Sequence, residues 1–512
     1  MEREDIMKKY LVISEVSKKQ GYIFKTNKLK ENIGASTIIE YITEDLPKRI
    51  GEKYNMELVS VGGGNSLFLF NTEDDGKNFI KYTTSEVISK FPGVEFFMTY
   101  VDFDDESESI IDKIDELYKK LNKKKSERKS VFKRNSYGIE EKCVTTGLAA
   151  TYRSNDGLLS RESEQKREWS LIEKLKKYSK ESTINNIIKK YEDKGYSFTN
   201  ELEELGIEKG ENSYIAIVSL DGNKMGQKIQ HLKNNAKKRF NKKNKKEANL
   251  KYQKELYKFS QSIKNHYEEA FCYMIDCIDE KYDKIKEKLN LKENIMPIRP
   301  IILAGDDVCF ICNAKIALEC VSKFVEKLNT YKLEGETLNA CAGICILKRN
   351  YPFDKGYEIA ETLCKSAKAK IVDCEKDTSL VDFHICQGEI SSTLGEIRDK
   401  SHINKDISLN IKPLYLNDNN KINNYNNFKN EYIRIENLSK ESKGKVRKLR
   451  DIFPLGKEET RIFMNKYQIS EEFSKKIDDY YCEFGFYKEN NKEVCLYFDI
   501  IEMLDMFINL DD

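Results

Sequence analysis

Two parts of the chain repeat the same order of apolar and polar patterns. From residue 214 onward, continuous apolar runs predict buried strands, and apolar residues at every third or fourth position predict helices. The predicted order is strand, helix, strand, strand, helix, strand and helix, over YIAIVSLDG (214–222), about 253–288, IRPIILAG (298–305), DDVCFICN (306–313), 315–331, TLNACAGICILK (337–348) and about 354–370. The first six elements are βαββαβ, the ferredoxin-like arrangement.

The N-terminal part predicts the same order of strands and helices, over KYLVISEVS (9–17), 34–51, MELVSVGGG with NSLFLFN (56–71), about 75–91 and VEFFMTYVDF (94–103). An internal repeat indicates architecture before any single motif is considered. We align the central hairpins, VGGGNSLFLF and LAGDDVCFIC, so that Asn65 takes the position of Asp306. One hairpin is therefore acidic and the other is not. The fold class we expect is α+β, with two ferredoxin-like units.

The segments outside the repeat complete the expected domain organisation. We expect the first unit over 1–130, a helical linker or insert over 131–208, the second unit over 209–390 and a helical C-terminal domain over 391–512. The Asn-rich stretch NDNNKINNYNNFKN, within that last domain, predicts a solvated loop.

Two basic stretches, 119–134 and 228–246, hold nine Lys or Arg residues each. Such runs are usually solvated, mobile loops, and contact with RNA or triphosphates is the alternative. The whole chain of 512 residues carries 88 Lys and Arg against 86 Asp and Glu, a net charge of only +2. Any basic binding surface must therefore be local.

The cysteines and the N-terminus indicate where the protein functions. The 13 cysteines show no secretory framework, and the first residues, MEREDIMKKY, are charged rather than signal-like. No apolar run approaches the roughly 18 residues that a membrane span needs. We therefore expect a cytoplasmic protein with reduced thiols and no membrane partner.

Three aspartates are the candidate catalytic residues. Asp306 and Asp307 interrupt an apolar run, where unpaired carboxylates cost several kcal/mol, and Asp221 ends the first strand of the same unit. In a βαββαβ sheet that strand end comes near the turn between the second and third strands. Three carboxylates together favour a hard divalent cation, Mg²⁺ or Mn²⁺, and two such ions are typical of nucleotidyl transfer. The simpler alternative is a hairpin tip with both aspartates in water.

Other residue types carry weaker signals. Lys365 and Lys368 could reach triphosphate oxygens, or could lie on an exposed helix face. Cys309 and Cys312 have CxxC spacing but lie in a predicted strand without a second pair, so we interpret them as core. The four histidines are scattered and no His-Asp dipeptide occurs, which argues against a histidine-aspartate metal hydrolase.

Several motifs together resemble one known family. These are VSKKQGYIFKTNKLKENIGAS, VGGGNSLFLF, SLDGNKMG, LAGDDVCFIC, CAGICILKRNYPF and AETLCKSAKAK. In this order they resemble the two palm domains of the large, polymerase-like Cas10 (Csm/Cmr) subunit of type III CRISPR complexes, whose second palm is related to GGDEF nucleotide cyclases. The resemblance covers about residues 9–103 and 214–390.

The resemblance implies an enzyme that joins ATP molecules into cyclic oligoadenylate messengers of antiviral defence, at a site between the palms. Asp221, Asp306 and Asp307 would hold two Mg²⁺ or Mn²⁺ ions. It further implies guide or target RNA, CRISPR effector subunits and a downstream cyclic-nucleotide sensor as partners. The residues expected to bind nucleotides are Gly63, Gly64, Asn65, Gly222, Gly305, Lys365 and Lys368.

The sequence departs from the family pattern at three points. Ala304 replaces the first glycine of the usual GGDD hairpin, and we expect no histidine-aspartate nuclease domain, because the sequence starts directly at the first unit. Only Cys143 remains where a four-cysteine zinc insert is usual, so we expect no structural zinc. Two alternatives stay open: a non-catalytic RNA-binding scaffold, against which the three retained aspartates argue, and a diguanylate-cyclase-like enzyme that uses GTP.

Overall fold

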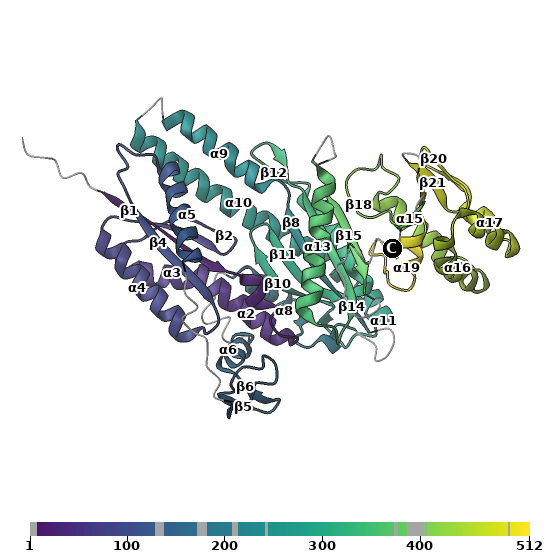
Figure 1. Cartoon of the computed structure of the whole chain (residues 1–512), viewed down its shortest axis with the longest axis horizontal. Helices are drawn as coiled ribbons and strands as arrows, with labels where there is room; N and C mark the ends of the chain where they lie inside the picture. The colour runs from purple at the N-terminus through teal and green to yellow at the C-terminus, as the bar shows by residue number, and fades with distance from the viewer. Residues whose placement is uncertain are drawn as a thin grey trace, which may run out of the picture.

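The protein is mixed α+β and elongated, with the N-terminal unit at one end and the C-terminal region at the other (Figure 1). The computed structural model describes residues 8–127, 138–171, 182–206, 213–240, 244–372, 377–386, 395, 403–404, 407–489 and 492–511. Among these residues, no helix combines the length and apolar character that crossing a membrane requires.

The first unit is built on a four-stranded antiparallel sheet with the order β2-β3-β1-β4. The central strand β1 (Lys9–Ser17) is apolar on both faces because each face is covered. Leu11 and Ile13 pack in the core that includes α5, whereas Val12 packs with α2 and α4. The other elements are α1 (Lys19–Ile23), α2 (Leu29–Thr43), α3 (Asp45–Gly51), η1 (Glu52–Tyr54), β2 (Glu57–Gly62), β3 (Asn65–Phe70), α4 (Glu73–Lys90), β4 (Glu95–Phe103) and α5 (Ile110–Ser126).

The second unit has a six-stranded sheet with the order β10-β11-β8-β14-β15-β18. Its first four strands repeat the antiparallel arrangement of the first unit, and β15 extends the sheet in parallel to β14. The strands are β8 (Tyr214–Gly222), β9 (Ile295–Met296), β10 (Ile298–Ala304), β11 (Asp307–Asn313), β12 (Lys332–Leu333), β13 (Glu336–Thr337), β14 (Ala340–Lys348), β15 (Leu380–Ile385) and β18 (Leu414–Tyr415). The helices are α9 (Met225–Phe240), α10 (Lys245–Glu280), α11 (Tyr282–Leu289), η3 (Ala314–Ile316), α12 (Ala317–Leu328) and α13 (Phe353–Ile371). The predicted βαββαβ order is present in both units.

The described residues of the basic stretch 228–246 are almost all helical, so the prediction of a mobile loop was wrong for them. α9 covers most of it, and α10 begins at Lys245. Leu232 and Ala236 are buried, while Lys233 and Lys237 form ion pairs of 2.7 and 2.9 Å with Asp115 and Asp112 on α5. The lysines therefore join α9 to the first unit.

The other basic stretch, 119–134, is only partly described, and residues 128–134 lie outside the described part. Residues 119–126 belong to α5. Lys120 and Lys124 donate hydrogen bonds of 2.8 and 2.7 Å to the carbonyls of Tyr100 and Met98 on β4. These lysines therefore cover backbone acceptors instead of forming a solvated loop.

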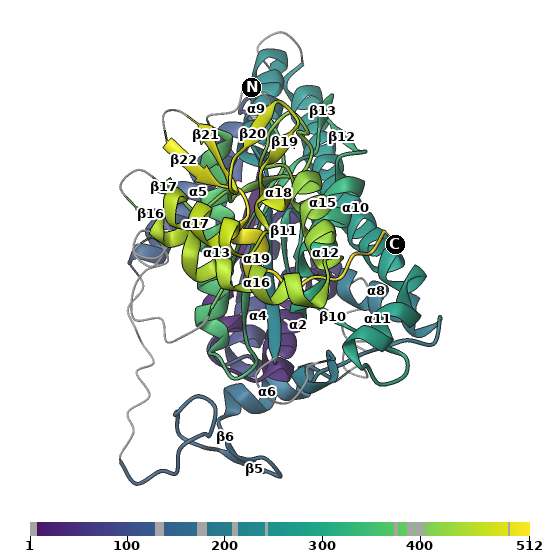
Figure 2. The ribbon, with the colours of Figure 1, turned by 90° about the vertical axis from the view of Figure 1, so that its right-hand side faces the viewer.

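Residues 152–169 of the segment between the units form a small lobe that projects from the body (Figures 1 and 2), whereas residues 183–198 lie against the second unit. The segment is partly helical, as expected, but it also holds a short hairpin. Its elements are β5 (Tyr152–Ser154), β6 (Gly157–Leu159), α6 (Arg161–Trp169), α8 (Thr183–Glu192), β7 (Ser197–Phe198) and η2 (Leu202–Glu204). α6 touches α2 backbone to backbone, because a Cβ atom added to Gly34 would lie 1.6 Å from the Lys166 carbonyl oxygen.

The sequence predicts a helical C-terminal region, but the structure shows that this region also contains strands. It combines a sheet of order β16-β17-β22-β21 and the hairpin β19-β20 with helices. Its strands are β16 (Ile403–Asn404), β17 (Ile407–Ser408), β19 (Lys475–Ile477), β20 (Tyr480–Cys482), β21 (Phe486–Glu489) and β22 (Lys492–Cys495). Its helices are α15 (Tyr425–Glu436), α16 (Lys440–Ile452), η4 (Phe453–Leu455), α17 (Lys457–Lys466), α18 (Ser470–Phe473) and α19 (Phe498–Glu502). Strands of two to four residues are too short to show a period of two.

The Asn-rich stretch of this region is also more ordered than predicted. α15 begins inside it, and the Asn424 side chain caps that helix by accepting a hydrogen bond from the Asn427 amide. Asn423 donates to the carbonyls of Ile411 and Pro413 at 3.0 Å each. The asparagines therefore satisfy backbone groups, a role that composition alone does not indicate.

Candidate functional site

The three predicted aspartates converge at one edge of the second sheet. Asp307 begins β11 directly opposite Asp221 on β8, and opposite residues of an antiparallel pair point to the same face. The Gly222 amide donates to the Asp306 carbonyl oxygen at 3.2 Å, which ties the turn to the end of β8. Gly305 permits this turn because its φ of +70° is in the left-handed region.

The charges of this acidic cluster are only partly compensated. Lys368 on α13 lies 2.6 Å from the Asp221 carboxylate, and Lys19 on α1 lies 2.9 Å from that of Asp307. No described lysine or arginine forms an ion pair with Asp306. Burial and the neighbouring charges of Asp221 and Asp307 raise the pKa of Asp306 to about 6.

Lys365 and Gly222, two of the predicted nucleotide-binding residues, make contacts that differ from the expectation. Lys368 also donates to the Gly222 carbonyl at 2.9 Å, whereas Lys365 is exposed and pairs with Glu361 at 3.1 Å. The structure therefore brings Lys368 to the aspartates and leaves Lys365 away from them. The Gly222 amide is already bonded to Asp306, so it is not a free donor for phosphate in this arrangement.

The non-acidic hairpin of the first unit has the same geometry as the acidic one, but its alignment differs from the prediction. Asn65 pairs with Gly62, as Asp307 pairs with Ala304. Asn65 therefore corresponds to Asp307 and not to Asp306, whose counterpart is Gly64. Both hairpins turn through two residues, and the turn length sets the register.

Lys19 connects the two hairpins, and the sequence prediction missed it. Its ammonium group contacts the Gly63 carbonyl at 3.3 Å as well as the Asp307 carboxylate. A Cβ atom added to Gly305 would lie 4.0 Å from the Gly63 amide nitrogen, so the hairpin tips face each other closely. One signal was available, because Lys19 follows the first strand of its unit at the same sheet edge where Asp221 ends its own.

A cavity of about 450 Å³ lies between the two units and includes both hairpins in its wall. Pockets of this size hold small ligands. Its apolar lining comes mainly from α2, α9 and α10, and from strands of both sheets. Lining residues include Gly63, Gly64, Asn65, Ile39, Leu67, Ile229, Leu256, Phe259, Ile263, Ile302, Gly305 and Asp306.

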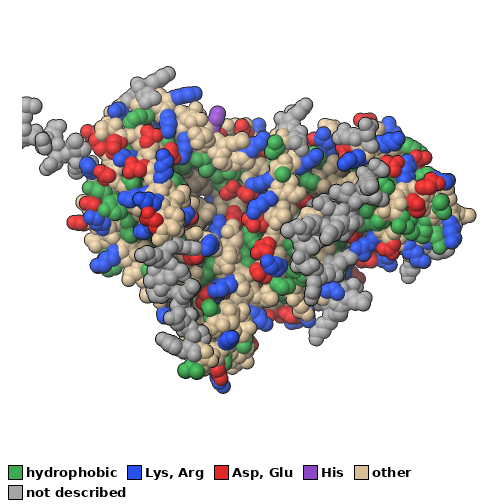
Figure 3. Space-filling model, in the orientation of Figure 1, with side chains coloured by type: hydrophobic (Ala, Val, Ile, Leu, Met, Phe, Trp, Pro, Cys, Tyr) green, Lys and Arg blue, Asp and Glu red, His purple; other side chains and the backbone are tan. Residues whose placement is uncertain are grey.

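The same cavity has a second charged region that the sequence did not indicate. Lys264 on α10 forms an ion pair of 2.7 Å with Glu44, and Glu40 accepts hydrogen bonds from Ser182 and from the Thr183 amide. Burial, and next the charge of Glu44, raise the pKa of Glu40 to about 7. Outside the cavity, acidic and basic side chains are interspersed over the face seen in Figure 3.

The donor chemistry of the acidic cluster fits a divalent cation. Its three carboxylates offer only oxygen ligands, which Mg²⁺ and Mn²⁺ prefer. Within the described ranges, however, no group of three or more His, Cys, Asp or Glu side chains is spaced to hold a metal ion. Two of the carboxylates contact Lys19 and Lys368 instead, so a bound cation would have to replace these contacts.

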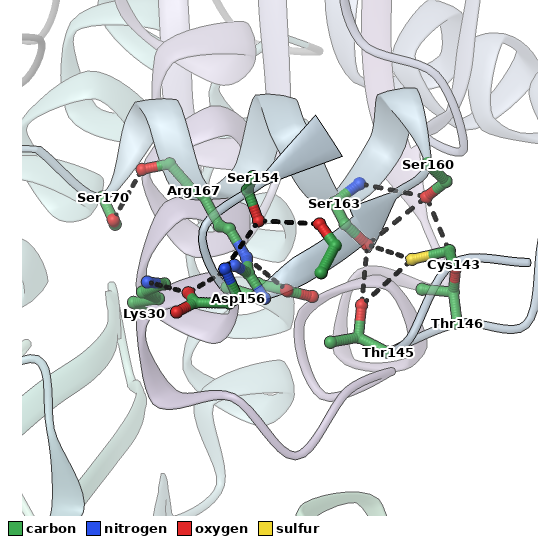
Figure 4. A network of polar contacts seen from close by, with 12 residues as sticks. Lys30, Cys143, Thr145, Thr146, Ser154, Asp156, Ser160, Ser163, Arg167 and Ser170 are labelled. Atoms are coloured by element: carbon green, nitrogen blue, oxygen red, sulfur yellow. Dashed lines mark hydrogen bonds and ion pairs between the residues drawn. The ribbon is translucent and has the colours of Figure 1, made fainter. Parts of the chain in front are cut away.

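Cys143 lies in a network of hydroxyl groups next to the start of α6 (Figure 4). It is buried, and its sulfur lies 3.3 Å from the Thr145 hydroxyl and 3.5 Å from that of Ser163. Burial alone would raise the pKa of Cys143, but hydrogen bonds from Thr145, Thr146 and Ser163 lower it to about 5. Cys143 is the single cysteine of residues 131–208, too few for a four-cysteine zinc site. The expectation that this segment holds no zinc stays a prediction.

Comparison with known proteins agrees with this fold. Residues 214–378 match the family model of the Cas10/Cmr2 second palm domain. No curated protein sequence matches the chain. A chain in the crystal structure of the apo Csm1–Csm4 cassette is 12% identical, with a TM-score of 0.51, and the match covers 99% of this chain and 71% of that one.

Two ligand-bound structures are less similar. The Csm1–Csm4 cassette in complex with cA3 matches at 12% identity and a TM-score of 0.45, over 78% of this chain and 56% of that one. The cassette in complex with one ATP matches at 12% identity and a TM-score of 0.45, over 73% and 55%. The chain thus spans little more than half the length of these two.

The fold and the hairpin pair define a palm-domain protein. Its second unit matches the Cas10/Cmr2 second palm domain, and the fold of the chain is similar to that of the apo Csm1–Csm4 chain.

Proposed function

We propose that the protein is a metal-dependent nucleotidyltransferase that joins ATP into cyclic oligoadenylates. The observation that carries this proposal is that an acidic and a non-acidic hairpin face each other closely and both form part of the wall of a cavity of about 450 Å³. A pair of aspartates in a solvated turn would need no such cavity. The match of residues 214–378 to the Cas10/Cmr2 second palm domain supports the same reaction class. ATP as substrate follows from the resemblance of the motifs to that family.

The topology supports interpreting both units as ferredoxin-like palms. Each has the βαββαβ order of elements and places its strands in the order second, third, first and fourth. In this interpretation the second unit carries out the chemistry, and the first presents the other nucleotide. Gly63, Gly64 and Asn65 add no negative charge near a second triphosphate, which favours its binding.

Asp221, Asp306 and Asp307 would hold Mg²⁺ or Mn²⁺. When bound, these cations would activate a 3′-hydroxyl group and neutralise the charge that develops on the triphosphate. Lys19 and Lys368 already lie at the carboxylates, and once released they would be free to hold phosphate oxygens. The apolar walls of the cavity would limit access of water and orient the bases.

The proposed reaction forms a bond between the 3′-oxygen of one ATP and the α-phosphorus of the next. The bond from that phosphorus to the bridging oxygen breaks, pyrophosphate leaves, and the hydroxyl proton passes to water. Closing the ring repeats this step within one oligonucleotide.

The test is to incubate the purified chain with radiolabelled ATP or GTP and Mg²⁺ or Mn²⁺, with and without RNA. Products are resolved by chromatography and mass. A cyclic adenylate product that is lost in the double variant Asp306→Asn, Asp307→Asn supports the proposal. A product from GTP would identify a diguanylate-cyclase-like enzyme, and tight RNA binding without any product would favour the scaffold alternative.

The partners are also proposals. We propose guide or target RNA, CRISPR effector subunits and a cyclic-nucleotide sensor as the partners of a cytoplasmic enzyme. The scaffold alternative has less support, because lysines of the 228–246 stretch are engaged in ion pairs with the first unit instead of being free for RNA.

A further inference from the structure

Tyr267 on α10 is buried directly beside the acidic cluster. Its side chain is only 2% exposed, and its ring packs edge-on against Phe324. A Cβ atom added to Gly222 would lie 2.5 Å from the Tyr267 hydroxyl oxygen and 2.9 Å from the Cβ atom of Asp306. The hydroxyl therefore occupies the space that a side chain at position 222 would fill, at the junction of β8 and the acidic turn.

The helix that carries Tyr267 also lines the cavity. Phe259, Ile263 and Tyr267 are four residues apart, and this spacing places them on one face of α10. Phe259 and Ile263 contribute to the cavity wall. Tyr267, one turn further along the same face, thus lies next to the aspartates.

The Tyr267 hydroxyl has no hydrogen-bond partner among the described residues. A buried hydroxyl without a partner costs folding free energy, and a phenylalanine at this position would fill the same space without that cost. The charged groups that act on the hydroxyl are the carboxylates of Asp306 and Asp221. Asp221 is held by Lys368, whereas Asp306 has no described ion-pair partner.

We propose that Tyr267 is a positioning residue for the cation site: its hydroxyl donates to the Asp306 carboxylate and leaves the other carboxylate oxygen for the cation. This inference rests on the proposed function. Hydrogen bonds of this kind orient metal-binding side chains, and their loss typically weakens metal affinity by about 10–100-fold. In the metal-free protein the unpaired Tyr267 hydroxyl would lower the folding stability, and in the cation-bound protein the same hydroxyl would donate to Asp306.

The test compares Tyr267→Phe with Tyr257→Phe in the full chain. Tyr257 lies on the same helix but is 41% exposed and lies outside the cavity lining. Mn²⁺ affinity is measured by electron paramagnetic resonance, and the melting temperature is measured with and without Mn²⁺. We expect Tyr267→Phe to weaken Mn²⁺ binding by about 10-fold or more and to keep or raise the melting temperature of the metal-free protein. Tyr257→Phe should change neither.

The outcomes separate this inference from the function on which it rests. Mn²⁺ binding that is lost in Asp306→Asn but unchanged in Tyr267→Phe would overturn the role of Tyr267 alone. A wild-type protein whose Mn²⁺ binding is absent or indifferent to Asp306→Asn would overturn both proposals. A Tyr267→Phe protein with a much lower metal-free melting temperature would show that the hydroxyl has a structural partner, and this too would overturn the inference.

Discussion

The fold destabilises the charged form of the Asp306 carboxylate. Its pKa is raised to about 6 by burial and by the charges of Asp221 and Asp307, whereas an aspartate in an unfolded chain titrates near pH 4. A group whose pKa is higher in the folded state contributes stability at low pH that is lost as the pH rises through the folded value. This loss is typical of acidic groups gathered for ligand binding.

Asp306→Asn should therefore stabilise the protein near pH 7 in the presence of a chelator. We expect a gain on the order of 1–3 kcal/mol in the free energy of unfolding, because the asparagine carries no charge to bury. The melting temperature should also depend less on pH between about 4 and 6. Thermal denaturation across this pH range measures both effects. A less stable variant at pH 7 would mean that the carboxylate has a structural role.

The two lysines of α13 provide a matched pair at the residue scale. Lys368 contacts Asp221 and the Gly222 carbonyl, whereas Lys365 is exposed and contacts Glu361. We expect Lys368→Met to lower the rate of nucleotide transfer by about 10-fold or more, in line with the loss of a charge-assisted hydrogen bond. Lys365→Met should stay within about two-fold of the wild type. Equal losses in both would contradict the assignment.

At the scale of elements, the close contact of α2 with α6 fixes the lobe between the units. Gly34 is required there because any side chain would collide with the Lys166 carbonyl. Arg167 of α6 also binds the buried carboxylate of Glu31 at 2.8 Å. Since α6 also contacts α1, where the Lys166 ammonium group donates to the Tyr22 carbonyl at 2.7 Å, this packing supports the helix that carries Lys19.

Gly34→Ala should accordingly destabilise the protein, by on the order of 1–3 kcal/mol or more, the range for overpacking in a core. Gly21→Ala on α1 is the control, because nothing lies within 4 Å of the added atom. That substitution should be neutral or stabilising by up to about 1 kcal/mol, since alanine favours helix. Urea denaturation of both variants measures the difference, and similar stabilities would disprove the close contact.

At the scale of the whole molecule, one buried carboxylate joins the C-terminal region to the second unit. Glu319 on α12 accepts hydrogen bonds from the Tyr425 hydroxyl and from the Leu510 amide, and it pairs with Lys429 at 2.9 Å. Tyr425 and Lys429 lie on α15, and Leu510 lies close to the chain's end. A fully enclosed anion with three donors fixes the relative position of these parts.

Glu319→Ala should therefore loosen the C-terminal region, because the Tyr425 hydroxyl and the Leu510 amide lose this buried acceptor, and the Lys429 ammonium group keeps only its ion pair with Asp511. The expected cost is about 3–5 kcal/mol, together with faster proteolysis between the second unit and the C-terminal region. Glu326→Ala on the same helix is the control, since this side chain is 53% exposed. Proteolysis at wild-type rates in Glu319→Ala would show that other contacts hold the two parts together.

Much of the architecture followed from the sequence because it is encoded locally. The four strands that the two sheets have in common were predicted in each unit, since a buried strand requires a continuous apolar run wherever it lies in the fold, whereas β15 and β18 of the second sheet were not. The convergence of Asp221, Asp306 and Asp307 was also predicted, because β8 and the acidic turn meet at one edge in any βαββαβ sheet. The short strands of the C-terminal region were missed because they carry too few residues for a period.

What the sequence by itself determined is the repeated unit and the acidic hairpin, both of which depend on neighbouring residues in the chain. Only the tertiary structure decided that Asn65 corresponds to Asp307, that the described part of the basic stretch 228–246 is helical, and that Lys368 rather than Lys365 contacts the aspartates. The same holds for Lys19 and Tyr267, whose contacts at the acidic hairpin come from distant parts of the chain. The physical reason is that a periodic pattern records which face of an element is buried, whereas the partners of a polar side chain depend on how the elements pack.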